Sequence, residues 1–133
     1  VLRSDLGMTG PKYGCGEGLC GSCTVLVDDE AMPSCQLRAA DAAGAEIVTI
    51  EGLASDGKLH PLQEAFIEKG AFQCGYCTPG MILKAYSLLK TNPNPSPEDI
   101  VWGTEDNLCR CGAHVRIVEA IQSAARIMKG GAS

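Results

Sequence analysis

The chain has 133 residues, of which 45% are hydrophobic and 20% charged, with 11 basic against 16 acidic residues and a formal net charge of -5. This composition is typical of a folded globular protein and excludes collagen-like, coiled-coil and low-complexity chains. The net negative charge does not favour binding to nucleic acid or to anionic lipid. Charged or polar residues interrupt every apolar run before the ~18 residues that a membrane helix needs. We therefore expect protein partners, no nucleic acid and no membrane span.

The N-terminal part is predicted to be mostly loop. Residues 1–6 are expected to form the end of a short helix. Glycines then recur from position 7 to position 21, and repeated glycine of this kind is typical of a loop. Three of the cysteines lie on or directly after this loop.

A β-hairpin is predicted next, with strands over 24–27 and 31–34 around a three-residue turn centred on Asp29. Aspartate tolerates the left-handed backbone that such a turn needs. If Asp29 is the pivot, Cys23 lies directly opposite Cys35. The hairpin would then return a fourth cysteine to the loop.

The hydrophobic period changes near the middle of the chain. A further strand is predicted over 46–50, and residues 52–60 have the composition of a linker. Beyond the linker the apolar spacing becomes helical. We therefore expect an α+β protein with two domains, residues 1–52 and residues 61–133.

The second half is predicted to contain four helices. Two are expected over 61–69 and 78–90, and a short third helix begins after Ser96, with Pro at its first position and an acidic residue at its third. The apolar stripes are Met81, Ile82, Ala85, Leu88 and Leu89 on the second helix and Ile117, Val118, Ile121, Ala124, Ala125 and Met128 on the last. Such stripes can pack together as a four-helix bundle.

Eight cysteines are the most unusual feature of the composition. They fall into two groups of four: Cys15, Cys20, Cys23 and Cys35, and then Cys74, Cys77, Cys109 and Cys111. Such grouping indicates two four-ligand sites rather than scattered buried thiols. Because aromatic residues make up only 5% of the chain, we expect the bound groups to contribute to folding.

The first group has the spacing Cys-x4-Cys-x2-Cys followed by a distant fourth cysteine, which is the plant-type 2Fe-2S pattern. A cluster with four thiolates carries net negative charge and needs hydrogen-bond donors around it. Without a Cβ atom, Gly14, Gly16, Gly18 and Gly21 can adopt positive φ and turn successive N–H groups of the loop toward the sulfurs, forming an anion-binding nest.

In the second group, Cys77 and Cys111 each precede a predicted helix. The free N–H groups and the dipole of a helix start favour thiolate there. An antiparallel return of the chain can bring Cys109 and Cys111 to Cys74 and Cys77. Taken alone, this group could also form a structural zinc site. Disulfides do not suit such short spacings.

Three sequence blocks carry a resemblance to a known family: Gly10–Val25, Gln73–Gly80 and Asn107–Gly112. Over nearly its whole length the chain resembles the iron–sulfur subunit of the molybdenum hydroxylases, the xanthine oxidase family, of the isoquinoline 1-oxidoreductase and aldehyde oxidoreductase type. All eight cysteines agree with the family's ligand positions. The family extends further at its N-terminal end, so the first domain is expected to lack its N-terminal strands.

The resemblance implies a β-grasp, ferredoxin-like domain followed by a four-helix bundle, each holding one 2Fe-2S cluster. It also implies that the second cluster lies beside a molybdopterin held by a large partner subunit, with Gln73 and Cys111 touching the pterin. The first cluster would pass electrons to a subunit that binds FAD or to a cytochrome with haem.

These observations together predict an electron-transfer subunit of a molybdopterin-dependent hydroxylase or dehydrogenase. It would have no catalytic residue of its own and would relay single electrons to a flavin or cytochrome acceptor. Two alternatives remain, a free-standing ferredoxin and a zinc-stabilised interaction module, although a free ferredoxin needs neither the helical half nor four further cysteines. We expect a cytoplasmic location, with the periplasm left open because an export signal would precede Val1.

Overall fold

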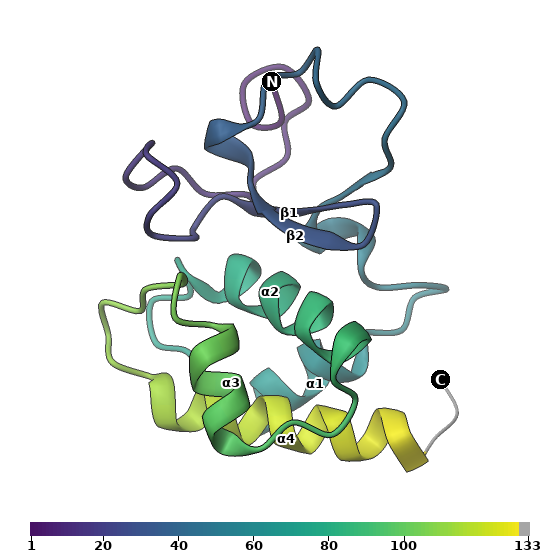
Figure 1. Ribbon diagram of the computed structural model, residues 1–133, viewed down its shortest axis with the longest axis vertical. Coiled ribbons are helices and arrows are strands. Elements are labelled where there is room, and N and C mark those ends of the chain that lie inside the picture. The colour runs from purple at the N-terminus through teal and green to yellow at the C-terminus, as the bar shows by residue number, and fades with distance from the viewer. Residues whose placement is uncertain (131–133) are drawn as a thin grey trace.

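A computed structural model describes residues 1–130, which form a small sheet lobe stacked on a helical lobe (Figure 1). The sheet has three antiparallel strands, β1 (Thr24–Val27), β2 (Glu30–Pro33) and β3 (Ile47–Val48), in the order β2-β1-β3. The predicted strand over 46–50 is shorter than expected, because the chain enters a 3-10 turn, Ile50–Gly52, directly after it.

The hairpin differs from the prediction by one residue. Its turn contains only Asp28 and Asp29, with φ of 50° and 70°, and Val27 pairs with Glu30. Two-residue turns with positive φ at both positions match the right-handed twist of the strands, so this shorter turn is favoured. The expected pairing of Cys23 with Cys35 is therefore wrong, and in this register Ser34 stands opposite Cys23.

The N-terminal segment also differs from the prediction. Residues 1–6 form hydrogen-bonded turns, in which the Asp5 N–H donates to the Val1 carbonyl (2.9 Å), and no helix. The glycines that follow keep the next stretch free of regular structure, as predicted.

Four helices form the second lobe: α1 (Pro61–Glu68), α2 (Thr78–Thr91), α3 (Pro97–Gly103) and α4 (His114–Gly130). Their apolar faces meet in one core, in which Phe66 of α1, Met81 of α2 and Ile117 of α4 are almost completely buried. Every residue of the two predicted stripes is buried in this core or packs against it. The helical prediction is confirmed, although residues 131–133 of the expected second domain lie outside the described residues.

The short helix α3 begins as its sequence predicts. The Asp99 N–H donates to Ser96 Oγ (3.1 Å), and the Ser96 N–H donates to Asp99 Oδ2 (2.8 Å). This reciprocal capping box satisfies two backbone donors that a helix start otherwise leaves unpaired. The Pro-rich segment before it turns the chain, so that α3 packs against α2 and α4.

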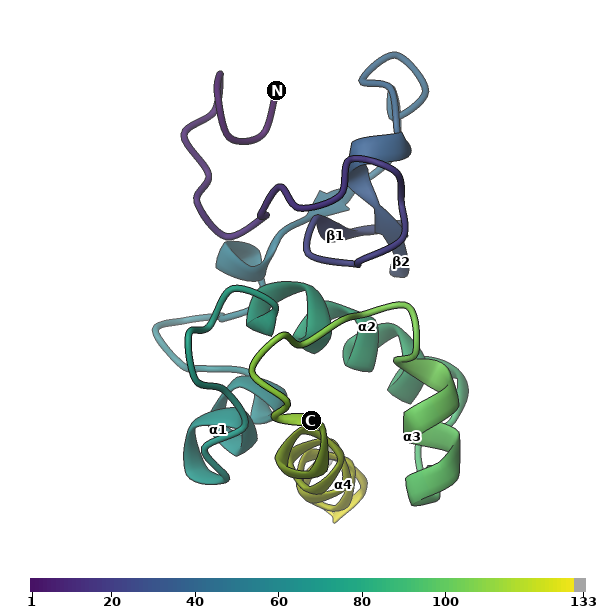
Figure 2. The same ribbon diagram turned by 90° about the vertical axis from the view of Figure 1, so that its left-hand side faces the viewer.

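Helix α2 joins the two lobes. Figures 1 and 2 show it between the sheet and the remaining helices. The Ala31 N–H of β2 donates to Ser87 Oγ of α2 (3.2 Å). None of the helices within residues 1–130 combines the length and the apolar character that crossing a membrane requires.

A histidine caps α1 and gives a testable pH dependence. His60 Nδ1 accepts the Leu62 N–H (3.2 Å), and burial lowers the His60 pKa below its usual 6.5. A lowered pKa means that folding favours neutral imidazole, so this contribution is present above the unfolded pKa and is lost as the pH falls through the folded pKa. We expect the melting temperature to fall between pH 7.5 and pH 5.5.

The variant His60→Asn isolates this effect, because asparagine caps a helix without titrating. Thermal melts of wild type and variant, monitored by circular dichroism at both pH values, measure it. The difference in melting temperature between wild type and variant should widen, in favour of the variant, at pH 5.5. An equal drop in both proteins would contradict the assignment.

Candidate metal centres

The first cysteine group lies on the loop before β1 and at the end of β2. Backbone N–H groups surround its sulfurs: Cys15 Sγ accepts from Glu17 and Leu19, each at 3.3 Å. Cys20 Sγ accepts from the Cys15 N–H (3.4 Å). This loop therefore presents donors to its thiols in the way that bound negative charge requires.

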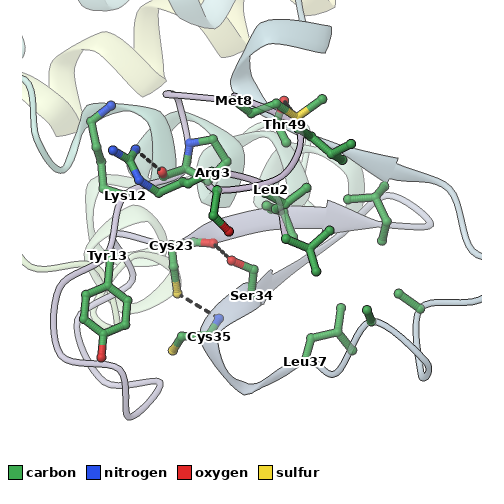
Figure 3. Close-up of a pocket in the computed structure, with 18 of the residues that line it drawn as sticks. Leu2, Arg3, Met8, Lys12, Tyr13, Cys23, Ser34, Cys35, Leu37 and Thr49 are labelled. Atoms are coloured by element: carbon green, nitrogen blue, oxygen red, sulfur yellow. Dashed lines mark hydrogen bonds between the residues drawn. The ribbon is translucent and has the colours of Figure 1, made fainter.

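The fourth cysteine reaches the group despite the changed register. Cys35 lies in a 3-10 turn, Ser34–Gln36, and its N–H donates to Cys23 Sγ (3.4 Å) (Figure 3). The Ser34 hydroxyl donates to the Cys23 carbonyl (2.7 Å) and holds the two segments together. The close-up places Cys23 and Cys35 side by side at the wall of a pocket of about 530 Å³.

Three of the four glycines singled out in this loop behave as predicted. Gly16, Gly18 and Gly21 have φ of 72°, 76° and 73°. Gly14 does not have positive φ, and that part of the prediction is wrong. Its missing side chain matters for space instead, since a Cβ there would lie 2.8 Å from Cys20 Sγ.

The thiols of this group differ in their pKa because their surroundings differ. The N–H groups of Glu17, Leu19 and Cys20 lower the pKa of the exposed Cys15 to about 6. Burial raises the pKa of Cys23. The first loop thus stabilises thiolate most strongly where the chain is open to solvent.

The second group brings together two loops of the helical lobe, residues 73–77 and residues 107–112 (Figure 2). Cys77 lies close to Cys109, and Cys74 lies close to Cys111. The Cys109 Sγ accepts the Ala113 N–H (3.4 Å) directly before α4. The antiparallel return that the sequence predicted is present.

The helix starts were expected to stabilise the thiolates of Cys77 and Cys111, but the structure shows this effect at Cys109 instead. Cys77 caps α2 but makes no side-chain capping bond, and burial, with Cys109 beside it, raises the pKa of Cys77 to about 12. The Ala113 N–H directly before α4 donates to the sulfur of Cys109 and not to that of Cys111. Burial opposes ionisation of Cys109, but the Ala113 N–H and neighbouring donors lower its pKa.

Close pairs of sulfurs occur in both groups, and in the second group Cys74 also lies near Cys77 and Cys109. Within residues 1–130, no three His, Cys, Asp or Glu side chains meet closely enough to hold one metal ion. A single zinc ion in a four-cysteine site needs all four thiolates around it. A 2Fe-2S cluster divides its four thiolates between two irons, so the close pairs Cys15–Cys20, Cys23–Cys35, Cys74–Cys111 and Cys77–Cys109 are compatible with diiron clusters.

Gln73 lies at the open side of the second group. Its Nε2 donates to the Cys111 carbonyl (3.4 Å), and its side chain is exposed. It lines a polar hollow of about 310 Å³ together with Arg116 and Glu119. The two residues expected to touch a pterin are thus joined by a hydrogen bond, with Gln73 exposed and Cys111 half-buried.

One residue of the site had no role in the sequence-based prediction. Asn107 is 3% exposed and reaches Gly21, 86 residues earlier in the chain. Its place two residues before Cys109 is the only local signal. No local pattern specifies a contact between the two lobes.

Comparison with known proteins identifies both lobes. Residues 1–49 match the family described as 2Fe-2S iron-sulfur cluster binding domain, and residues 49–122 match the 2Fe-2S binding domain family. The chain is 53% identical over 125 residues to one of the subunits of nicotinate dehydrogenase from Pseudomonas putida, covering 94% of this chain and 80% of that protein. It is 47% identical over 126 residues to the alpha subunit of isoquinoline 1-oxidoreductase from Brevundimonas diminuta, covering 95% and 82%.

Solved structures agree with this result. The chain matches quinoline 2-oxidoreductase from Pseudomonas putida 86 with a TM-score of 0.92 and 43% identity, over 98% of this chain and 82% of that one. It matches aldehyde oxidoreductase from Desulfovibrio gigas with the same TM-score and 42% identity, over 98% of this chain but only 15% of that one. In that enzyme the matching part belongs to a much longer polypeptide.

The fold and the matched domain families define an α+β iron–sulfur protein with two groups of four cysteines. The chain belongs to the family of small 2Fe-2S subunits of the molybdenum hydroxylases. Members of this family are electron-transfer subunits of heteromeric oxidoreductases, in which a partner carries out the substrate chemistry. The predicted fold class and function are confirmed, and the free carrier and the zinc module are disfavoured.

Proposed function

We propose that each cysteine group holds one 2Fe-2S cluster and that the two clusters act in series. The ligands would be Cys15, Cys20, Cys23 and Cys35 in the first lobe and Cys74, Cys77, Cys109 and Cys111 in the second. The main support for this proposal is that backbone N–H groups donate to cysteine sulfurs in both lobes. When bound, each cluster supplies one-electron chemistry.

The sulfur pairs suggest how each site divides its ligands. Cys15 lies with Cys20 and Cys23 with Cys35, so each pair would bind one iron of the first cluster. In the second lobe the corresponding pairs are Cys74 with Cys111 and Cys77 with Cys109. The N–H donors would offset the negative charge of the thiolates and so favour the reduced state.

The same geometry suggests which end of the chain faces each partner. Gln73 is exposed beside the second group and donates to the carbonyl of the half-buried Cys111, and we assign both residues to contact with the pterin of a large molybdopterin-binding subunit. The exposed Cys15 loop in the other lobe would then face the electron acceptor, an FAD-binding or cytochrome subunit. Electrons would leave the molybdenum centre through the helical lobe and exit through the sheet lobe.

The domain division and the location belong to the same proposal. We assign residues 1–52 to the ferredoxin-like domain and residues 61–133 to the helical domain, with the intervening segment as the linker. A cytoplasmic complex fits eight cysteines that form no disulfide bonds, since free thiols persist in a reducing compartment.

Metal analysis of the purified protein tests the proposal. We expect about four irons and an equal amount of acid-labile sulfide per chain, because two diiron clusters require that stoichiometry. Reduction with dithionite should produce two distinct electron paramagnetic resonance (EPR) signals, and a large molybdenum-containing subunit should copurify. A colourless protein that contains zinc and no sulfide would contradict the proposal.

A further inference from the structure

One buried side chain joins the two cysteine loops. Asn107 Nδ2 donates to the Gly21 carbonyl (3.1 Å) and to Thr24 Oγ1 (3.4 Å). Gly21 directly follows Cys20 of the first group, and Asn107 comes two residues before Cys109 of the second. The amide therefore links the chain segments that carry ligands of both proposed clusters.

Neighbouring backbone groups hold Asn107 in place from both sides. The adjacent Leu108 N–H donates to the Cys20 carbonyl (2.9 Å), which adds a second bond between the same two loops. The Asn107 N–H donates to the carbonyl of the buried Thr104, whose hydroxyl donates to the Ile100 carbonyl of α3 (2.8 Å). The loop from the first lobe is thus fastened to the end of a helix in the second.

The contact between Gly21 and Asn107 is also tightly packed. A Cβ on Gly21 would lie 2.5 Å from Asn107 Nδ2, and Gly21 has φ of +73°. Glycine is therefore required for its carbonyl to face the amide at this distance. An apolar side chain at position 107 could fill the same space. The buried Asn107 amide, with its two hydrogen bonds, additionally specifies one arrangement of the two loops.

We propose that Asn107 is a positioning residue that sets the separation and orientation of the two clusters. The inference rests on the proposed function, because it supposes that both groups bind iron. Electron transfer between centres falls steeply with their separation, so a fixed contact between the ligand loops keeps the transfer fast. Asn107 is not one of the proposed ligands and would act through the loops, by its bonds to Gly21 and Thr24.

EPR spectroscopy of the reduced, purified complex tests this role. Two reduced clusters, each with one unpaired electron, split each other's signals by an amount that depends on the inverse cube of their separation. The variant Asn107→Leu keeps a similar volume and removes both donors. The control is Asn92→Leu. The side-chain amide of Asn92 donates a hydrogen bond to Asp99 Oδ2 (3.3 Å), and both residues lie inside the helical lobe.

Asn107→Leu should shift or abolish the splitting at full iron content, and Asn92→Leu should retain it. Thr24→Val, which removes one of the two acceptors, should give a smaller change. Faster amide hydrogen exchange across residues 18–24 and 105–110 should accompany the loss in Asn107→Leu only. If that variant does not assemble, Asn107→Ala takes its place, because it removes both donors without adding bulk or a charge.

An unchanged splitting and unchanged exchange in the assembled Asn107 variant would overturn the inference. The failure of the proposed function has a different signature: the wild-type complex would then lack two reduced-cluster signals. In that case amide exchange still decides whether Asn107 holds the loops together. The two failures can therefore be told apart in one set of samples.

Discussion

Replacing Cys109 with serine is expected to remove the second cluster and leave the first in place. The Cys109 sulfur accepts the N–H before α4 and lies beside Cys77, so its loss removes one ligand from the pair. Iron and acid-labile sulfide should fall to about half, because each lobe holds its own cluster. Metal analysis and EPR of the reduced protein measure the result.

Cys23→Ser is the matched control for this experiment, because it should remove the other signal and leave the second cluster. The helical content should survive Cys109→Ser, since Phe66, Met81 and Ile117 fill the centre of the helical core, whereas Cys109 only packs against its edge and serine has nearly the same size. Thermal stability should fall, because binding of the group contributes to folding free energy. Loss of both signals in either variant would show that the clusters do not bind independently.

Gly80→Ala is expected to be the most disruptive of the single-methyl changes. Gly80 lies in the first turn of α2, where an added Cβ would be 2.3 Å from the Gly21 carbonyl oxygen. That oxygen belongs to the backbone and cannot rotate away, so the lobes must separate or the helix must shift. Overpacking of this kind costs about 1–3 kcal/mol, which thermal or denaturant unfolding can measure.

The control for this change is Gly130→Ala at the end of α4, where, among residues 1–130, the added methyl would meet nothing within 4 Å apart from its own helix backbone and chain neighbours. Alanine has the higher helix propensity, so the control should be neutral or slightly stabilising. The two variants make the same chemical change in helical glycines and differ only in the space available. Equal stability of both would show that the lobes can adjust without cost.

The two experiments act on different properties of the same junction. Cys109→Ser tests what the loops bind, and Gly80→Ala tests how closely the lobes approach. Both concern the region where Gly21, Asn107 and the start of α2 meet. The proposed electron route between the clusters would pass through this region, so changes in iron content and in stability should be measured separately.

Much of the fold was predictable from local patterns. The capping box at Ser96 and the apolar stripe around Ile117 depend on residues within one or two helical turns, and both are confirmed. The cysteine spacing likewise predicted two four-sulfur groups. The hairpin register was not predicted correctly, because a two-residue and a three-residue turn fit the same Asp-rich segment and differ only in how well their twist matches the strands.

The sequence by itself determined which chemistry this protein has. The cysteine spacing, the loop glycines and the helix boundaries each depend on residues that are close together in the chain, so they can be recognised without the tertiary structure. Only the tertiary structure decided how the two centres are joined. Asn107 bonds to Gly21 across 86 residues, and a methyl group on Gly80 would collide with that same glycine. The donor before α4 likewise reaches Cys109 and not Cys111. These contacts arise from packing between lobes, and packing depends on the relative placement of segments that no local pattern specifies.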